Sequence, residues 1–387
     1  TAAAIAHKTV LVRVDFNVPL DKTVSPPKIK DASRIEVALK TIHFLLEHQA
    51  KVILMSHLGR PKADVVDEHG KSTSDPELSL APVATYIKGH YQLPISFVPA
   101  CIGAEVRTTV AAMKPGTVLL LENLRFYKAE KKNDPVFAQN LAQLADVYID
   151  EAFSNAHRAH ASMVAVTQKL KSFAGFRLAE EVTNLHALLH RPKRPFVIVV
   201  GGAKISDKVG ALTNLSKIAD AVLVGGGVAN NFLKAEGIEI HKSYLQDAPV
   251  DSAKEQVNYV QVADEIIESH RTERLLKDGY IPLPKIIFPT DVVAARSLTA
   301  EKTQVIDLTH DVVDTDQDKQ LMYLDIGPNT IRLYKELLLQ AGTIFWNGPM
   351  GVYEDERFAT GTAEIAQAIA RSSALTILGG GDTIGAI

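Results

Sequence analysis

Short apolar runs that recur along the whole chain constrain its fold more than any other feature. They lie at residues 10–14, 52–55, 118–121, 147–149, 196–200, 221–224, 286–288, 323–324, 343–346 and 375–378. The runs are continuous rather than alternating, as expected for strands buried on both faces of a parallel sheet. Helical patterns separate several of these runs, and such alternation is typical of α/β layers. We therefore predict an α/β fold with two doubly wound parallel-sheet (Rossmann-like) lobes joined by a hinge helix.

Two of the helical segments carry a start signal, and a third, at 362–371, repeats their apolar pattern. Residues 33–49 begin with Ser33 and Glu36 at the spacing of a capping box. Residues 330–340 begin with Thr330, a residue type favoured at N-caps. We expect Ser33 and Thr330 to cap the free backbone N–H groups of these helices.

The length of the chain predicts two domains. At 387 residues it exceeds the size at which a single hydrophobic core stops growing. A helical stripe of Leu178, Val182, Leu185 and Leu189 precedes a Pro-rich turn at 191–195 and a fresh strand. We place an N-terminal domain at 1–172, a hinge helix and linker at 173–195, and a C-terminal domain at 196–387.

Composition excludes several classes of protein. The net charge of −3 implies no bulk attraction to nucleic acid or to an anionic membrane. Cys101 is the single cysteine, so an internal disulfide is impossible, and no Cys/His spacing matches a zinc site. No apolar run approaches the length of a membrane span, and the start has no signal-peptide pattern. We expect a cytoplasmic protein with small-molecule partners.

In the first half of the chain, cationic residues follow the apolar runs. His57 and Arg60 follow the run at 52–55, Arg125 follows the run at 118–121, and Arg158 follows the run at 147–149. Arg34 lies at the start of a helical segment. Ligands of α/β sheets bind beyond the carboxyl ends of the strands, and guanidinium groups gathered there repel one another unless an anion joins them. The alternative interpretation of each residue, taken singly, is a surface charge or a histidine whose hydrogen bonds are made within the protein. Their joint position predicts an anion site.

Asp15 and Asn17 follow the first strand, and their alternation puts both side chains on one face. These side chains could hydrogen-bond a hydroxyl group of the same ligand. The alternative is an Asx turn that leads into Pro19. A pair of histidines, His157 and His160, also suggests a metal, but two ligands without a third make a weak case.

In the second half, glycines follow the apolar runs. Gly201 and Gly202 precede Lys204 and Lys208, whose four-residue spacing suggests one helical face. Glycines in this position leave backbone N–H groups free for a phosphate. The alternative is a glycine turn before a solvated amphipathic helix. The sequence does not contain a P-loop motif or the Gly-x-Gly-x-x-Gly motif of dinucleotide-binding folds.

Three further glycine-rich segments strengthen the prediction of a phosphate-bearing ligand. They are Gly225–Gly227, the segment Asn347 to Glu354, and Gly379-Gly380-Gly381-Asp382-Thr383. Asp382 and Thr383 suit Mg²⁺ and a phosphate at a helix N-terminus, and Glu354 could accept hydrogen bonds from a ribose. In the alternative interpretations, Asp382 is an ordinary N-cap and Glu354 is exposed on a tight turn.

The two halves together indicate two substrates and a transfer between them. A nicotinamide dehydrogenase would require the missing dinucleotide motif. A scaffolding protein would need neither the cationic cluster nor the glycine set. Both remain as the alternatives to a transferase.

The motifs, taken in order, resemble those of the phosphoglycerate kinase family. The matching segments are VRVDFNVP, SHLGRP, LLENLRF, AHRAH, VVGGAKISDK, VGGGVANNF, WNGPMGVYE and GGGDT. They are spread over nearly the whole chain, so chance agreement is implausible. The resemblance implies a monomeric cytoplasmic phosphotransferase of glycolysis that acts on a carboxyl group. It would interconvert 1,3-bisphosphoglycerate plus ADP with 3-phosphoglycerate plus ATP, with Mg²⁺.

The resemblance also implies residue roles. On the glycerate side, Asp15 and Asn17 would meet the hydroxyl and carboxyl end, and Arg34 would reach the phosphoryl group in transit. The distal phosphate would be held by His57, Arg60, Arg125 and Arg158. On the nucleotide side, the residues would be Lys204, Lys208, Gly225, Gly226, Gly227, Asn347, Glu354, Gly380, Gly381, Asp382 and Thr383. Arg34, Lys204 and Lys208 would be catalytic, and Asp382 would bind the metal.

The chain departs from the family pattern at two places. Ser154 and Asn155 stand where many members carry Gly-Thr, and we expect this to change the shape of the loop rather than the chemistry. Family members also continue past GGGDT, so we expect either that a C-terminal tail follows Ile387 or that the chain is a fragment with little activity.

Overall fold

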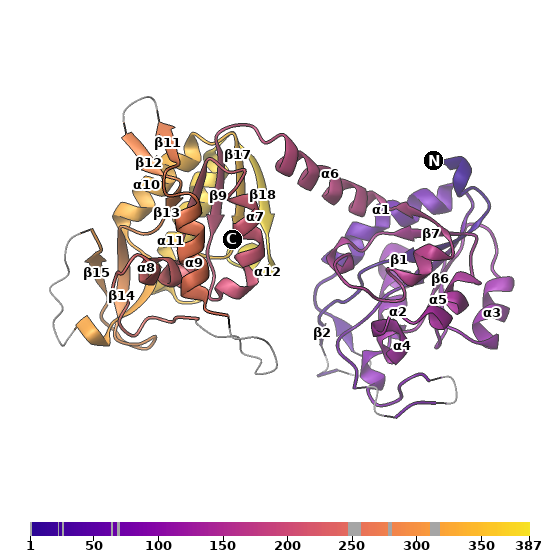
Figure 1. Ribbon diagram of the computed structural model, residues 1–387. Coiled ribbons are helices and arrows are strands. Elements are labelled where there is room, and N and C mark those ends of the chain that lie inside the picture. The colour runs from indigo at the N-terminus through magenta and orange to yellow at the C-terminus, as the bar shows by residue number, and fades with distance from the viewer. Residues whose placement is uncertain are drawn as a thin grey trace. The chain divides into compact units, whose positions relative to one another are not determined.

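The computed structural model describes residues 2–21, 23–24, 27–62, 65–67, 70–246, 257–277, 281–309 and 318–387. The chain divides into two compact units, Thr1–Leu185 and His186–Ile387. The division falls inside helix α6 (Phe176–His190). Figure 1 shows that each unit has its own sheet with helices against it.

The first unit is built on a six-stranded parallel sheet in the order β5-β6-β4-β1-β7-β8. Its strands are β1 (Thr9–Arg13), β4 (Lys51–Met55), β5 (Ile95–Phe97), β6 (Val118–Leu120), β7 (Val147–Asp150) and β8 (Lys171–Ala174). Its helices are α1 (Ser33–Glu47), α2 (Ala81–Tyr91), α3 (Ala104–Ala111), α4 (Lys128–Lys131) and α5 (Pro135–Ala142). A small hairpin of β2 (Leu20–Asp21) and β3 (Lys28–Ile29) precedes α1.

Successive residues of these strands face opposite sides of the sheet, so each continuous apolar run supplies two cores. Val10 and Val12 pack with α1 and α2 on one face. Leu11 packs with α3 and α5 on the other face. This confirms that the apolar runs of this sheet are strands buried on both sides. The same expectation was wrong for the run at 375–378, which forms β18 (Leu375–Gly379), because the residues of that strand are exposed or partly exposed.

The second unit is built on a five-stranded parallel sheet in the order β13-β10-β9-β17-β18. Its strands are β9 (Phe196–Val200), β10 (Ala221–Val224), β13 (Ile286–Ile287), β17 (Thr343–Asn347) and β18 (Leu375–Gly379). Its helices are α7 (Val209–Leu215), α8 (Gly226–Ala235), α9 (Tyr259–Ser269), α10 (Pro328–Leu339), α11 (Thr360–Arg371) and α12 (Gly381–Gly385). Helices α10 and α11 cover one face through Tyr334 and Ile365.

The run at 323–324 forms a strand, but its expected place in a parallel sheet was wrong. It belongs to β16 (Met322–Ile326), which pairs antiparallel with β14 (Asp291–Ala295) in a separate sheet with β15 (Gln304–Asp307). A further hairpin joins β11 (Arg274–Lys277) to β12 (Ile281–Pro284). The prediction failed because an antiparallel sheet covered by a helix also buries continuous apolar runs. Helix α8 packs against the sheet of β14, β15 and β16 through Leu233.

Both expected N-caps were wrong. Ser33 is the first residue of α1, Ala32 is its N-cap, and no side chain caps the helix. Ser33 instead donates to Asp31 Oδ2 at 3.0 Å. Helix α10 begins at Pro328 with Gly327 as its N-cap, and Thr330 lies buried inside it, where its hydroxyl donates to Asp291 Oδ1 at 2.7 Å. Pro at the first helical position is a start signal that outweighs a hydroxyl two residues later.

The helix that carries the division between the units buries little of its surface. Of the residues of α6, only Leu188 is buried, while Val182 and Leu189 are 51% and 45% exposed. The apolar stripe predicted for this helix is therefore partly or fully exposed along its length. Because most helical stability in proteins comes from tertiary packing of an apolar face, α6 receives little of this stabilisation.

Candidate active site

Four neighbouring strands of the first sheet end in polar side chains at one edge. β1 leads to Asp15 and Asn17, β4 to His57 and Arg60, β6 to Arg125 and β7 to Arg158. Because β6, β4, β1 and β7 are adjacent in the sheet, residues far apart in sequence meet there. This is the convergence that the joint position of these residues predicts.

A cavity of about 340 Å³ lies at this edge, and its lining is cationic. It is lined by Asn17, His57, Gly59, Arg60, Arg125, Lys131, Arg158 and His160. No acidic side chain is among these described lining residues. Neither Arg60 nor Arg158 forms an ion pair with any described residue. Such a concentration of unpaired cations is a receptor for an anion.

Arg125 is the most constrained of these cations. It is 8% exposed, and its Nη1 donates to the carbonyl of Gly59 at 2.7 Å. Its Nε is buried and has no hydrogen-bond partner in the described structure. Burial, followed by the charges of Arg158 and Arg13, lowers the pKa of Arg125. A buried donor without a partner is costly, and an anion oxygen in the cavity would satisfy it.

His57 is held neutral by its surroundings. Burial, and then the charges of Arg13 and Arg125, lower the pKa of His57 to about 2. Nη2 of Arg13 lies 3.1 Å from Nδ1 of His57. Because arginine can only donate, Nδ1 accepts and the ring proton must be on Nε2. His57 therefore offers a neutral N–H donor rather than a positive charge.

A buried layer behind the cavity fixes these side chains. Arg13 is 1% exposed, and its Nε donates to Ser162 Oγ at 3.0 Å. Ser162 Oγ donates in turn to Glu130 Oε1 at 2.6 Å. Burial, and then the charge of Arg125, lower the pKa of His160 to about 4. The sequence analysis did not assign Arg13 or Lys131 to the site. A charged residue inside an otherwise apolar strand, as at Arg13, was the available signal.

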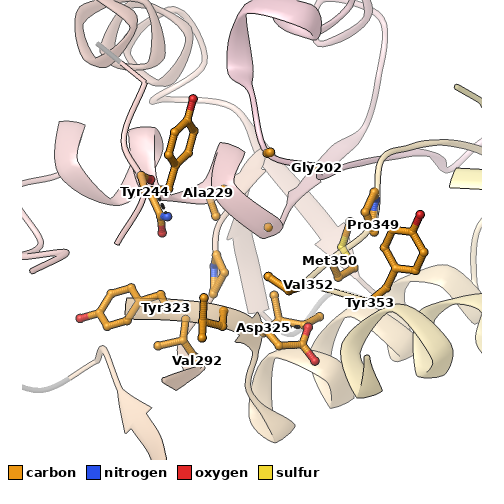
Figure 2. A pocket seen from close by; sticks show the side chains of 18 of the residues that line it. Gly202, Ala229, Tyr244, Val292, Tyr323, Asp325, Pro349, Met350, Val352 and Tyr353 are labelled. Carbon is orange, nitrogen blue, oxygen red and sulfur yellow. Dashed lines mark hydrogen bonds between the residues drawn. The ribbon is translucent and has the colours of Figure 1, made fainter. Parts of the chain in front are cut away.

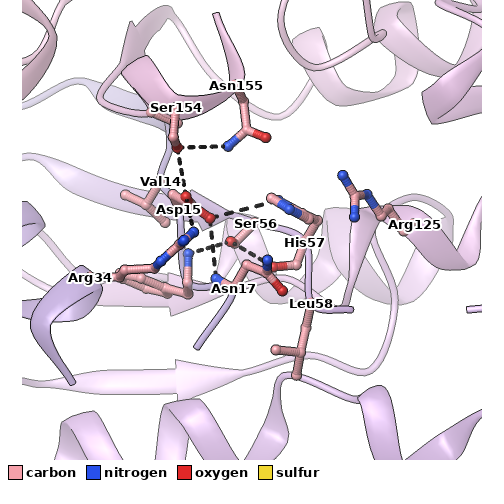
Figure 3. Close-up of polar contacts among 12 residues, drawn as sticks. Val14, Asp15, Asn17, Arg34, Ser56, His57, Leu58, Arg125, Ser154 and Asn155 are labelled. Atoms are coloured by element: carbon pink, nitrogen blue, oxygen red, sulfur yellow. Dashed lines mark hydrogen bonds and ion pairs between the residues drawn. The ribbon is translucent and has the colours of Figure 1, made fainter. Parts of the chain in front are cut away.

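Asp15 and Arg34 form a pair beside the cavity rather than part of its lining. Arg34 Nη1 donates to Asp15 Oδ2 at 2.6 Å, and the Oδ1 atom lies 3.9 Å from Nδ1 of His57 (Figure 3). Asn17 does line the cavity, and its Oδ1 accepts from the backbone N–H of Gly59 at 2.8 Å. The Asx-turn alternative is also realised, because Asn17 N donates to Asp15 Oδ1 at 3.2 Å.

In the second unit, four neighbouring strands end in glycine-rich loops. β10 leads to Gly225, β9 to Gly201, β17 to Gly348 and β18 to Gly380. A Cβ atom at Gly201 would overlap the carbonyl oxygen of Pro349, and one at Gly227 would lie 2.6 Å from the carbonyl oxygen of Ala203. The glycines therefore allow the loops to touch one another.

The expectation of free backbone N–H groups was wrong for several of these glycines. Gly201 N donates to Asn347 O at 2.9 Å and Gly202 N to Pro349 O at 2.7 Å. Gly226 N donates to Met350 O at 2.8 Å. The loops use these donors to bind each other, because buried N–H groups need partners.

A cavity of about 370 Å³ lies beside these loops, and Figure 2 shows part of its lining. Gly226, Gly227, Glu354 and Asp382 line it, as does an apolar group of residues that the sequence analysis did not assign. That group includes Tyr244, Val292, Tyr323, Met350 and Val352. An apolar chamber with a few polar groups at its margin is typical of a small-molecule site.

Asp325 is an unexpected acidic member of this lining. It is 4% exposed, and its Oδ2 accepts from Gly361 N at 2.7 Å. Burial raises the pKa of Asp325 to about 7, against the effect of backbone donors that lower it. The carboxyl group thus changes charge near neutral pH.

The other predicted residues of the second unit lie on the loops around this cavity without lining it. Lys204 precedes the short 3-10 helix Ile205–Asp207, and Lys208 follows it. Their expected place on one helical face was therefore wrong. The hydroxyl of Thr383 donates to Gly379 O and accepts from Gly348 N, while Oδ1 of Asn347 is buried and has no hydrogen-bond partner among the described residues. Gly225, Gly380 and Gly381 are not among the lining residues either.

No cluster of three or more His, Cys, Asp or Glu side chains suited to a metal occurs in the described part of the chain. Within those residues, His157 and His160 have no third side chain that would complete a metal site. None of the helices in the described ranges has the length and hydropathy to cross a membrane.

Comparison with known proteins gives one consistent answer. A sequence model of the family described as phosphoglycerate kinase matches residues 1–387. The phosphoglycerate kinase of Moorella thermoacetica is 44% identical over 381 residues, which are 98% of this chain and 88% of that protein. That of Herpetosiphon aurantiacus is 43% identical over 385 residues, which are 99% of this chain and 88% of that protein.

Solved structures agree with the sequences. The phosphoglycerate kinase from Coxiella burnetii superposes with a TM-score of 0.79 at 36% identity, covering 99% of this chain and 87% of that one. The enzyme from Pyrococcus horikoshii gives a TM-score of 0.75 at 30% identity, covering 99% and 88%. The chain therefore belongs to the phosphoglycerate kinase family, the phosphotransferases that interconvert 1,3-bisphosphoglycerate plus ADP and 3-phosphoglycerate plus ATP in glycolysis.

Proposed function

We propose that the two substrates of this reaction are divided between the units, with the phosphoglycerate on the first and the magnesium nucleotide on the second. The carrying observation is the cationic cavity of the first unit, in which the buried Nε of Arg125 has no partner among the described residues. In this proposal the distal phosphate of the glycerate occupies that cavity among Arg60, Arg125 and Arg158. His57 adds a neutral N–H donor, and Lys131 and His160 join the lining.

The nucleotide would occupy the cavity of the second unit. Its base and ribose would lie against the apolar group and Glu354, and its phosphates would extend toward Lys204, Lys208 and the loop from Gly380 to Thr383. Asp382, exposed at the edge of the cavity, would hold Mg²⁺ together with phosphate oxygens. One carboxylate fits this metal, because protein-bound Mg²⁺ usually takes one or two carboxylates plus substrate phosphates. The bound ion would neutralise phosphate charge.

The chemistry needs no general base from the protein. In the direction that consumes ATP the nucleophile is a carboxylate, which is ionised near neutrality because its pKa is about 4. The protein must align the reacting groups and neutralise charge on the phosphoryl group in transit. Arg34, Lys204 and Lys208 suit that task. Arg34 must leave Asp15 to perform it, since its guanidinium is bound to that carboxylate in this structure.

The proposed division predicts a crossed pattern of binding. Arg60→Gln should weaken 3-phosphoglycerate binding about tenfold or more and leave MgADP binding unchanged. Asp382→Asn should weaken MgADP binding and leave 3-phosphoglycerate binding unchanged. Isothermal titration of each variant with each ligand measures both. If either variant loses both ligands while its unfolding curve stays normal, the division is wrong.

Arg34 has a separate test. Arg34→Ala should lower kcat by about 100-fold or more, because a donor to the transferring group is lost, while MgADP affinity stays near normal. A coupled assay of ATP formation from 1,3-bisphosphoglycerate measures kcat. An unchanged kcat would remove Arg34 from the mechanism.

The transfer also requires the substrates to come together, and we propose that the chain bends at α6 when both are bound. The small buried surface of this helix supports a segment that can change conformation. Addition of both substrates should reduce the radius of gyration in solution scattering.

We further propose that the protein works as a cytoplasmic monomer, because all the proposed residues belong to one chain. Sedimentation equilibrium tests the oligomeric state.

A further inference from the structure

The carboxylate of Asp15 is held by two side chains that lie far apart in the sequence. Arg34 Nη1 and Ser154 Oγ both donate to its Oδ2 atom, each at 2.6 Å (Figure 3). Arg34 lies in the first turn of α1, whereas Ser154 lies in the 3-10 helix Phe153–Asn155 that follows β7. The same oxygen therefore has a charged donor and a neutral donor.

The hydrogen-bond direction of Ser154 is determined by its neighbours. Asn155 Nδ2 donates to Ser154 Oγ at 3.2 Å, so the hydroxyl oxygen acts there as an acceptor. A carboxylate can only accept, so the single hydroxyl proton is directed to Asp15. Asn155 is 3% exposed, which restrains the group that orients Ser154.

Arg34 is much more exposed than the carboxylate that it binds. The side chain of Arg34 is 49% exposed, whereas that of Asp15 is 14% exposed. An arginine that leaves toward a phosphoryl group removes the charge that balances this carboxylate. A partly buried carboxylate then needs its remaining hydrogen bonds to stay ionised and in place.

From this geometry we infer that Ser154 is a positioning residue that holds the Asp15 carboxylate when Arg34 moves to the phosphoryl group in transit. This inference rests on the proposed role of Arg34. In this role Ser154 contacts neither a substrate nor the reacting atoms. It acts by lowering the free-energy cost of separating Arg34 from Asp15. Without Ser154, Asp15 would keep Arg34 as its only side-chain hydrogen-bond donor among the described residues, and the arginine would leave less readily.

Ser154→Ala should lower kcat about three- to tenfold, the effect of one ordinary hydrogen bond. KM for MgATP should change less than twofold, and the thermal unfolding midpoint should be unaltered because Ser154 is exposed. Ser154→Thr, which keeps the hydroxyl, should restore kcat. Ser33→Ala is the matched control, since Ser33 is an exposed serine of the same unit that also donates to an aspartate, and its kcat should equal that of the wild type.

A double-mutant cycle decides whether Ser154 acts through Arg34. If it does, Ser154→Ala should cause no further loss in the Arg34→Ala background. An equal loss in both backgrounds, or a kcat of Ser154→Ala within about 1.5-fold of the wild type, would overturn the inference. Failure of the proposed function is distinguishable, because it would show as a normal kcat in Arg34→Ala itself.

Discussion

In the first unit the central strands end in charged and amide side chains, whereas in the second unit the corresponding strands end in glycines. The polar side chains of the first unit are fixed by hydrogen bonds that include Arg13 to His57 and Asn17 to Gly59. The glycines of the second unit allow three loops to pack backbone against backbone. The same kind of sheet thus supports two ways of building a binding surface.

The difference shows where each unit is vulnerable. A site made of side chains can lose one contact and keep its shape, because the backbone beneath it is unchanged. A site made of closely packed loops has no such separation, since one added carbon atom displaces the chain. We therefore expect substitutions of the polar side chains of the first unit to change binding, and substitutions of the loop glycines of the second unit to change folding.

The largest effect should come from Gly201→Ala. The added Cβ would overlap the carbonyl oxygen of Pro349, and backbone cannot move aside as a flexible side chain can. We expect a loss of about 3 kcal/mol or more in the free energy of unfolding. Urea denaturation followed by the fluorescence of Trp346, the only tryptophan, measures it. Gly210→Ala in α7, where nothing lies within 4 Å, should be neutral or stabilising.

Arg125→Gln should have the next largest effect, and on binding rather than folding. Loss of this nearly buried cation should lower kcat/KM for 3-phosphoglycerate about 100-fold, close to 3 kcal/mol. KM for MgATP should stay the same. Arg107→Gln, at an exposed position on α3, is the control and should behave as the wild type. An equal loss for both substrates would contradict the contrast between the units.

The third effect is a pH dependence of the second unit's stability that comes from Asp325. Burial raises the pKa of Asp325 to about 7 from 3.8, so the folded protein binds a proton that the unfolded chain releases. Stability should therefore fall as pH rises from 5 to 8, by on the order of 2–3 kcal/mol from this group. Asp325→Asn should flatten this slope, although its absolute stability will differ because one backbone donor loses its acceptor. Urea denaturation at each pH measures the slope, and an unchanged slope in the variant would refute this origin.

The smallest effect should come from Tyr244→Ala at the edge of the second cavity. Tyr244 is 45% exposed, so it can contribute only part of its ring to a nucleotide base. We expect KM for MgATP to rise about fivefold, close to 1 kcal/mol, with stability almost unchanged. Tyr244→Phe keeps the ring and should leave KM as it is. A larger effect of Tyr244→Phe than of Tyr244→Ala would show that the hydroxyl, not the ring, matters.

Much of the fold could be predicted because its signals are local. The continuous apolar runs located four of the six strands of the first parallel sheet and all five of the second, but they missed β5 and β8 at the edges of the first sheet. Cationic or glycine residues after those runs indicated the edges at which ligands bind. The errors arose where a local signal competed with a tertiary one. Thr330 was expected to cap a helix, but it lies buried against Asp291, and Lys204 and Lys208 were separated by a 3-10 turn.

The amino-acid sequence by itself determined the alternation of strands and helices and the type of residue that follows each strand, because hydrophobic periodicity acts over neighbouring residues. Only the tertiary structure decided which of these residues meet. Ser154 reaches Asp15 across 139 positions, and Arg13 reaches His57 across 44, because β1 lies between β4 and β7 in the sheet. The order of strands in a sheet depends on how whole elements pack, and no short segment of the sequence contains that information.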